Sequence, residues 1–131
     1  MKLVIEGVPR TKKNGLRRIK RGRRIFTVPS AAHEAWEAIA VPQLAKQFRA
    51  WARGLPMGAP VDFALNMRAL VYRDRDVGDL LNYLAAVSDV LERAGVVAND
   101  RLIVSVDGSR LLLDRARPRV EIELTPYSSL E

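Results

Sequence analysis

Acidic residues in the second half of the chain have a spacing that suits a hard cation. Asp79, Asn82 and Asp89 lie in a stretch whose apolar residues recur every three or four positions, which is typical of a helix. At 100° per residue they form one polar stripe, together with Arg93, along the border of the apolar face. Carboxylates and an amide beside a buried face suit Mg²⁺, which takes one or two carboxylates together with water and phosphate oxygens. Structural roles are the alternative, because Asp79 can cap the helix and Asp89 can pair with Arg93.

The positive charge of the chain is concentrated near its N-terminus. The 131 residues carry a net charge of +7. Residues 1–24 hold ten basic residues and one acidic residue, a net of +9, whereas residues 25–131 hold twelve basic and fourteen acidic residues, a net of −2. We call residues 7–28 the basic arm. Its charge density predicts binding to nucleic-acid phosphates that weakens as salt rises, although it does not distinguish DNA from RNA. The expected contact residues are Arg10, Lys12, Lys13, Arg17, Arg18, Lys20, Arg21, Arg23 and Arg24.

The elements that must position these residues follow from hydrophobic patterning and turn residues. The first helix should carry a buried stripe ending at Trp51 and should be kinked or divided by Pro42. On its first turn we expect His33 at the surface. We predict strands at 2–6, 61–71, 102–106, 111–114 (returning after the Asp107-Gly108 turn) and 119–124, a hairpin at 16–28, and helices at 30–53 and 79–94.

These elements favour an α+β fold with a mixed β-sheet packed by two main helices. With 48% hydrophobic residues and no cysteine, residues 1–131 fit a single domain held together by a hydrophobic core. The N-terminus does not resemble a secretory signal, and no stretch reaches the roughly 20 apolar residues that span a bilayer. We therefore expect a cytoplasmic protein with no membrane partner. Within the domain we distinguish the basic arm (7–28), a metal-site helix and loop (76–101) and C-terminal strands (102–125).

The segment from Asp79 to Arg101 resembles the signature of RusA-type Holliday-junction resolvases. In that family a helix opens with Asp-x-Asp-Asn, carries a Lys three residues and an Asp seven residues after the Asn, and leads into a loop that ends in Asp-Asp. The spacing fits without a gap from Asp79 to Asp100. Further likenesses are Gly7-x-Pro9 followed by Lys12, Lys13 and Asn14, Pro29-Ser30 with Trp36, and Pro118 to Ile122.

The resemblance implies a RusA-like fold and a function. The family consists of endodeoxyribonucleases that resolve four-way (Holliday) DNA junctions by paired phosphodiester hydrolysis. Applied to this chain, it implies a homodimer that binds branched DNA and uses Mg²⁺, for which Mn²⁺ can substitute. Carried over by position, Asp79 and Asp100 are metal-binding and catalytic carboxylates, with Asn82 and Asp89 in supporting positions.

Three positions depart from the family pattern. Leu81 replaces the second helix Asp, Ala85 replaces the Lys, and Asn99 replaces the first residue of the Asp-Asp pair. The missing roles could pass to Asp74, Asp89 or Lys12, and above all to Asp76, which we predict as a further catalytic and metal-binding residue. If the helix began three residues early, Asp76 would lie on it at 60° from Asp79. Alternatively, the protein binds branched DNA and cuts it weakly or not at all. A small basic RNA-binding protein is a third, more distant hypothesis.

Overall fold

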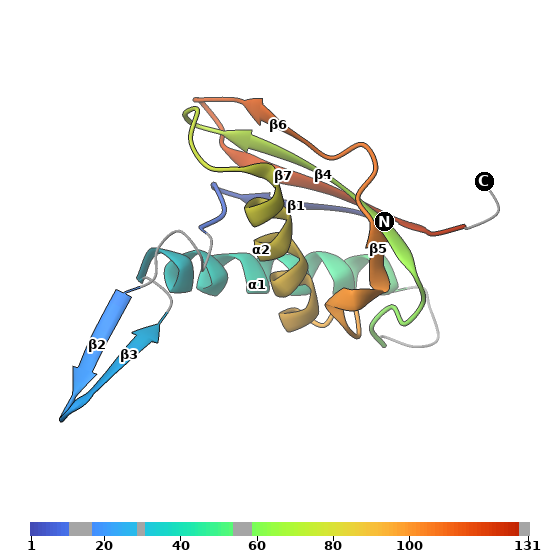
Figure 1. Cartoon of the computed structure of the whole chain (residues 1–131). Helices are drawn as coiled ribbons and strands as arrows, with labels where there is room; N and C mark the ends of the chain where they lie inside the picture. Colours follow the sequence, from blue (N-terminus) through green and yellow to red (C-terminus); the bar gives the residue numbers. More distant parts are fainter. Residues whose placement is uncertain (11–16, 29–30, 54–58, 129–131) are drawn as a thin grey trace.

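The structure is a computed structural model that describes residues 1–10, 17–28, 31–53 and 59–128. It confirms the predicted α+β architecture, because a mixed sheet is packed by two helices on one face (Figure 1). None of the helices in these ranges is long and apolar enough to cross a membrane. The elements are β1 (Lys2–Glu6), β2 (Arg17–Arg21), β3 (Arg24–Val28), α1 (Ala31–Ala52), β4 (Leu65–Arg73), α2 (Leu80–Arg93), the 3₁₀ helix η1 (Asp100–Leu102), β5 (Ile103–Ser105), β6 (Arg110–Leu113) and β7 (Arg119–Pro126).

The main sheet has the order β1-β7-β4, with β5 and β6 both pairing with the far edge of β4. β7 is antiparallel to β1 and to β4, whereas β5 and β6 run parallel to β4. Side chains of β4 alternate between buried and half-buried, so one face of the sheet meets the helices and the other remains accessible. The predicted strand at 61–71 begins only at Leu65, because Val61 forms an isolated bridge with Val97 and Phe63 is half exposed.

The prediction that the strand at 111–114 returns beside the preceding strand is wrong. β6 does not pair with β5 as a hairpin; the two strands follow one another along the same edge of β4. Side chains bridge the gap between them. The Ser109 hydroxyl accepts a hydrogen bond from the Ala69 amide (2.9 Å) and donates to the Met67 carbonyl (3.1 Å). The Asn66 side-chain oxygen accepts from the Asp107 amide (2.8 Å), so the segment between β5 and β6 stays fixed to β4.

Helix α1 is continuous from Ala31 to Ala52, so of the two predicted effects of Pro42, a kink or a division, the division is wrong. Pro42 is exposed, and the helical hydrogen bond that it cannot donate is lost at the solvent side. The predicted buried stripe is confirmed at Trp36, Ala40, Leu44 and Phe48. Trp51 departs from it, because it is half exposed and stacks on Phe48 with ring centroids 6.1 Å apart.

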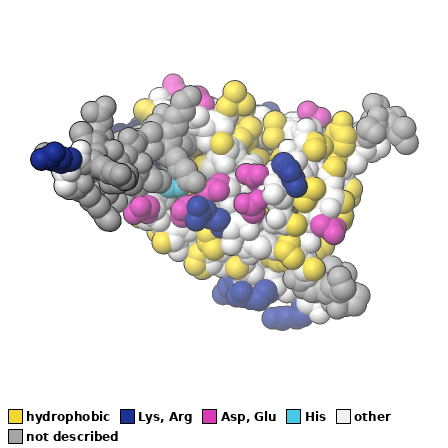
Figure 2. All heavy atoms as spheres, turned by 60° about the horizontal axis from the view of Figure 1, so that its bottom comes forward, with side chains coloured by type: hydrophobic (Ala, Val, Ile, Leu, Met, Phe, Trp, Pro, Cys, Tyr) yellow, Lys and Arg dark blue, Asp and Glu magenta, His cyan; other side chains and the backbone are white. Residues whose placement is uncertain are grey.

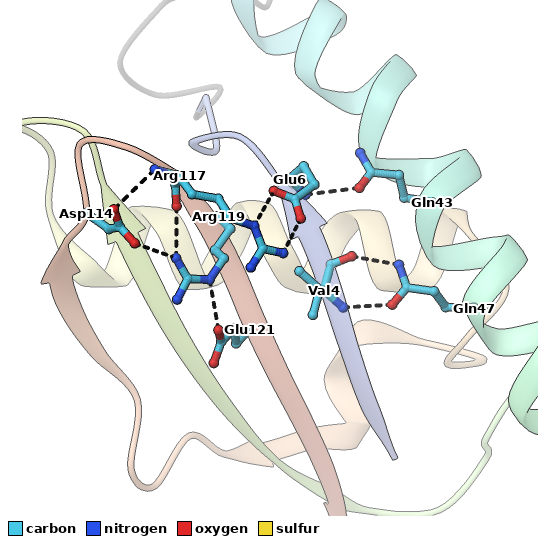
Figure 3. A network of polar contacts seen from close by, with 8 residues as sticks. All are labelled: Val4, Glu6, Gln43, Gln47, Asp114, Arg117, Arg119 and Glu121. Atoms are coloured by element: carbon cyan, nitrogen blue, oxygen red, sulfur yellow. Dashed lines mark hydrogen bonds and ion pairs between the residues drawn. The ribbon is translucent and has the colours of Figure 1, made fainter.

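Two glutamines of α1 fasten the helix to the edge strand β1 (Figure 3). The Gln47 side chain accepts from the Val4 amide (2.8 Å) and donates to the Val4 carbonyl (2.7 Å), as a neighbouring strand would. The Gln43 side chain accepts from the Glu6 amide (3.0 Å). Open sheet edges invite pairing with other chains. Gln47 and Gln43 therefore cover part of the β1 edge and fix the position of α1.

Charged side chains tie the other strand ends together, as Figure 3 also shows. Arg119 donates to Asp114 (2.8 Å) and Glu121 (2.8 Å), and Arg117 pairs with Glu6. The hydrogen bond from Arg119 holds the pKa of the Asp114 carboxyl below its usual value, and the bond from Arg117 does the same for Glu6. These contacts fix the turn before β7 against the end of β1.

The basic arm contains the predicted hairpin, formed by β2 and β3. The strands are antiparallel, with Arg21 opposite Arg24, and Gly22 takes the positive φ of +62° that the tight turn requires. In Figure 1 this ribbon projects away from the sheet and the helices. The backbone of the hairpin thus lies clear of the body of the protein.

The glutamine contacts predict unequal effects of two similar substitutions. Gln47→Ala removes two partly buried hydrogen bonds and should lower the free energy of unfolding by about 2 kcal/mol. Gln43→Ala, the matched control on the same helix, removes two solvent-exposed bonds, from the Glu6 amide and to the Ile39 carbonyl, and should cost about 0.5 kcal/mol. Urea denaturation followed by circular dichroism measures both values. Equal losses for the two variants would contradict the proposed role of Gln47.

Candidate metal and nucleic-acid sites

The first predicted site residue, Asp79, caps the N-terminus of α2. One carboxylate oxygen accepts from the Asn82 amide (3.0 Å), and the other accepts from the Asn82 side chain (2.8 Å). Asn82 therefore orients Asp79. The carboxylate is exposed, and each of its oxygens retains a second lone pair. It can bind a hydrated Mg²⁺ without losing its cap contacts.

A buried tyrosine fixes the loop that leads to Asp79. The Tyr83 hydroxyl donates to the Val77 carbonyl (2.8 Å), and its ring packs on Gly78, which has a φ of +84°. Burial raises the pKa of the Tyr83 hydroxyl above its usual value. Arg10 at the root of the basic arm lies close enough to lower that pKa in part. The arm root and the start of α2 are therefore neighbours.

Asp76 is not part of α2, because the helix begins at Leu80 rather than three residues before Asp79. Its carboxylate is 91% exposed and pairs with Arg73 (3.1 Å), whose guanidinium also donates to the Val77 carbonyl (3.1 Å). The early helix start that would place Asp76 on α2 is therefore not present. Asp76 still lies at the same end of α2 as Asp79, within the loop that Tyr83 holds.

Asp100 lies at the opposite end of α2, where it begins η1 and its amide donates to Glu92 (3.0 Å). The fourteen residues of α2 span about 21 Å at 1.5 Å per residue. Among the described residues, Asp76, Asp79 and Asp100 do not form a group of metal-ligand atoms. The arrangement expected from the sequence, with Asp100 and Asp79 sharing one cation, is therefore not formed within a single chain.

A cluster that the sequence analysis missed lies between α1 and α2. His33 is 1% exposed, so the expectation of a surface histidine is wrong. His33, Glu37 and Asp89 each offer a ligand atom, and these atoms lie within 4.8 Å of one another. Arg93 contacts Glu37 (3.0 Å) and Asp89 (3.1 Å). Asp89 thus lies away from both Asp79 and Asp100. The i,i+4 spacing of His33 and Glu37 is the signal in the sequence that could have indicated this cluster.

Figure 2 looks toward the helices from below and shows how charge is distributed on that side. Asp and Glu side chains gather in the middle of this face, and only a small part of the histidine reaches the surface beside them. The predicted contacts with DNA belong to the basic arm. Of its predicted DNA contacts, Arg10, Arg17, Arg18, Lys20, Arg21, Arg23 and Arg24 are in the described residues, whereas Lys12 and Lys13 lie outside them.

The outward face of α2 is apolar at two positions where the family resemblance predicts polar side chains. Leu81 is 74% exposed, and Ala85 is exposed one turn further along the helix. Val77 is also half exposed, just before the helix. Leu81 and Ala85 point outward, so they supply neither a ligand nor a positive charge to the Asp79 end of the helix. This stripe is open to contact with another surface.

No family model matches the chain. A search of characterised proteins finds a crossover junction endodeoxyribonuclease RusA from Aquifex aeolicus (strain VF5) to which the chain is similar. The two are 29% identical over 130 residues, which cover 98% of this chain and 94% of the relative. The similarity therefore extends over the arm, both helices and the whole sheet.

The start of α2 should be sensitive to a substitution at Gly78. A Cβ there would lie 2.2 Å from the Tyr83 hydroxyl oxygen. Gly78→Ala should lower the free energy of unfolding by about 2 kcal/mol or more, since a strained φ and a clash combine. Gly95→Ala is the matched control at the other end of α2: its φ is +75°, but nothing lies within 4 Å of the added Cβ. It should cost about 1 kcal/mol. Thermal denaturation compares the two, and a larger loss for Gly95→Ala would contradict this account.

Proposed function

We propose that this chain is a Mg²⁺-dependent endodeoxyribonuclease that acts as a homodimer on four-way DNA junctions. The observation that carries the proposal is the similarity to a RusA crossover junction endodeoxyribonuclease over 98% of this chain. Two features of the structure support it. The projecting basic arm suits a phosphate backbone, and the exposed Asp79 carboxylate beside its root suits a metal ion.

The chemistry follows from the needs of phosphodiester hydrolysis. A divalent ion held by carboxylates supplies a nucleophilic water and stabilises negative charge on the phosphate and the leaving oxygen. Asp79, oriented by Asn82, would hold this ion, with Asp76 nearby in the same loop. Arg10 lies near the same end of α2 and can neutralise a bound phosphate. The basic arm keeps the DNA backbone at this end of the helix.

Asp100 enters the proposed site from a second copy of the chain. A two-fold axis that passes Ala85 would pair the outward faces of two α2 helices in antiparallel fashion. Asp79 lies about 9 Å along the helix from Ala85 in one direction, and Glu92, which holds the Asp100 amide, lies about 10 Å in the other. This pairing brings Asp79 of one copy level with Asp100 of the other. The exposed Leu81 and Ala85 suit such a contact, because a small side chain lets helices approach closely.

A four-way junction has two-fold symmetry, and so does the proposed dimer. Two sites, each formed by Asp79 of one copy and Asp100 of the other, would then face two symmetric phosphodiester bonds. The alternative is a protein of the same fold that binds branched DNA without cutting it. The outward positions of Leu81 and Ala85 favour this alternative, because α2 carries no further carboxylate or amine beside Asp79 at these positions.

We expect the full-length protein to introduce symmetric nicks into a synthetic four-way junction in the presence of Mg²⁺. Asp79→Asn and Asp100→Asn should each lower the nicking rate by about 10²-fold or more, because the metal loses a charged ligand. Junction binding, measured by gel shift, should persist because the basic arm is intact. Asp107→Asn, a substitution of an exposed Asp outside the site, should nick at the wild-type rate.

Two results would contradict this function. Tight junction binding without product at any Mg²⁺ or Mn²⁺ concentration would show that the protein binds branched DNA without cutting it. Stronger binding to duplex or hairpin RNA than to branched DNA would exclude both DNA-based functions.

The composite site predicts complementation between two inactive variants. In a mixed dimer of Asp79→Asn and Asp100→Asn chains, one site carries both substitutions and the other carries neither. Mixing the two variants should therefore restore nicking at one strand per junction, to about half the wild-type rate per mixed dimer. Product analysis on strand-labelled junctions measures this. Mixing either variant with itself is the control. If each chain held a complete site, no mixture would recover activity.

A further inference from the structure

The buried histidine between α1 and α2 lies in a set of side chains with the composition of a transition-metal site. His33 and Glu37 are one turn apart on α1, with 3.6 Å between the imidazole Nε2 and a carboxylate oxygen of Glu37. Asp89 reaches the same place from α2, and one ligand atom from each of the three residues lies within 4.8 Å of the others. This set lies away from Asp79 and Asp100 and has no part in the proposed nuclease chemistry.

The orientation of the imidazole is fixed from its other side. The ring nitrogen Nδ1 lies 2.5 Å from the carbonyl oxygen of Arg10. A carbonyl oxygen only accepts hydrogen bonds, so Nδ1 carries the hydrogen, and in the neutral ring Nε2 carries the lone pair. Metal-binding histidines commonly donate their second ring N–H to a backbone carbonyl in this way, which fixes the tautomer and the ring orientation. Arg10 thus directs the Nε2 lone pair toward Glu37.

The Nε2 lone pair and the Glu37 carboxylate oxygen, 3.6 Å apart, are two donor atoms that a single cation could share. We propose that His33, Glu37 and Asp89 bind Zn²⁺. An imidazole nitrogen with two carboxylates is a normal Zn²⁺ ligand set, whereas Mg²⁺ prefers oxygen ligands alone. Ligands at about 2.0–2.2 Å from a tetrahedral Zn²⁺ are roughly 3.3–3.6 Å apart. The His33–Glu37 distance already meets this value, and Asp89 needs only a side-chain adjustment to join them.

Arg93 would compete with a metal ion for the carboxylates of this site. Its guanidinium contacts the Glu37 and Asp89 carboxylates, at 3.0 and 3.1 Å, and neutralises them when no metal is bound. The side chain is 52% exposed, so it can withdraw toward solvent when an ion binds. The site should therefore bind Zn²⁺ more weakly than the same three ligands would without Arg93.

The location of the site gives it a structural consequence. Arg10 is the last described residue before the segment that leads into β2, and His33 lies in the first turn of α1, just after the arm returns to the body. Asp89 belongs to α2. A bound Zn²⁺ would join the two ends of the basic arm to α2. This inference does not depend on the proposed nuclease function, because metal binding is measured without DNA.

Isothermal titration calorimetry of the full-length protein with Zn²⁺ tests the site, with Mg²⁺ titrated in parallel. We expect one Zn²⁺ per chain at this site and no Mg²⁺ bound there. Glu37→Gln and Asp89→Asn should weaken Zn²⁺ binding by about tenfold or more, since even loss of an outer-shell partner of a metal ligand costs that much. Glu34→Gln, an exposed carboxylate on the same turn of α1, is the matched control and should bind Zn²⁺ as the wild type does.

A second variant separates a metal site from an ion-pair cluster. Arg93→Gln removes the competing cation and should tighten Zn²⁺ binding, a gain that misfolding cannot produce. Circular dichroism confirms that each variant is folded. Zn²⁺ binding that is absent in the folded wild type, or that is unchanged in both Glu37→Gln and Asp89→Asn, would overturn the proposal. Weaker or unchanged binding by Arg93→Gln would do so as well. In those cases His33, Glu37, Asp89 and Arg93 form a polar cluster that binds no metal.

Discussion

The length of α2 decides which acidic side chains can act together. Its fourteen residues span about 21 Å, with Asp79 at the start of the helix and Asp100 hydrogen-bonded to Glu92 near its end. The helix is fixed at both ends: Asp79 and Tyr83 hold its start, and the Glu92 carboxylate accepts from the Asp100 amide just beyond its end. A cation site that needs both aspartates therefore requires a second copy of the chain. The dimer is then a condition for the proposed chemistry and follows from the geometry of a single helix.

Side chains on different sides of α2 have different roles. The apolar side, represented by Val87 and Val90, is fully buried against the sheet and the other helix. The polar side carries Asp89 toward His33 of α1. The third side carries Leu81 outward into solvent, where it is available to a partner surface. One helix thus contributes to the core, to a mixed-ligand cluster and to the proposed dimer contact, because its residues point in three directions.

Helices and strands that depend on a local hydrophobic pattern can be predicted from the sequence. In α2 apolar residues recur every three or four positions, and in β7 they alternate with polar ones, because each element buries one face. Both elements lie close to their predicted bounds. The pairing of β5 and β6 was not predictable in this way, because it depends on the Ser109 side chain replacing a strand partner. His33 was misplaced because its burial depends on packing of α1 against distant residues. The separation of Asp79 and Asp100, by contrast, already followed from the predicted helix length.

The basic arm and the acidic residues carry opposite charge, yet the root of the arm, at Arg10, lies near the acidic start of α2. Arg10 and Asp79 both act on the Tyr83 hydroxyl, so the root of the arm lies at the end of α2 that carries the predicted metal ligand. A phosphate held by the arm would otherwise be repelled by bare carboxylates nearby. A divalent ion on those carboxylates reverses the sign of the local charge and makes the same place attractive to phosphate. Metal binding and DNA binding at this end of the helix should therefore reinforce one another, and the net charge of +7 is the sum of +9 in the arm and −2 in the rest of the chain.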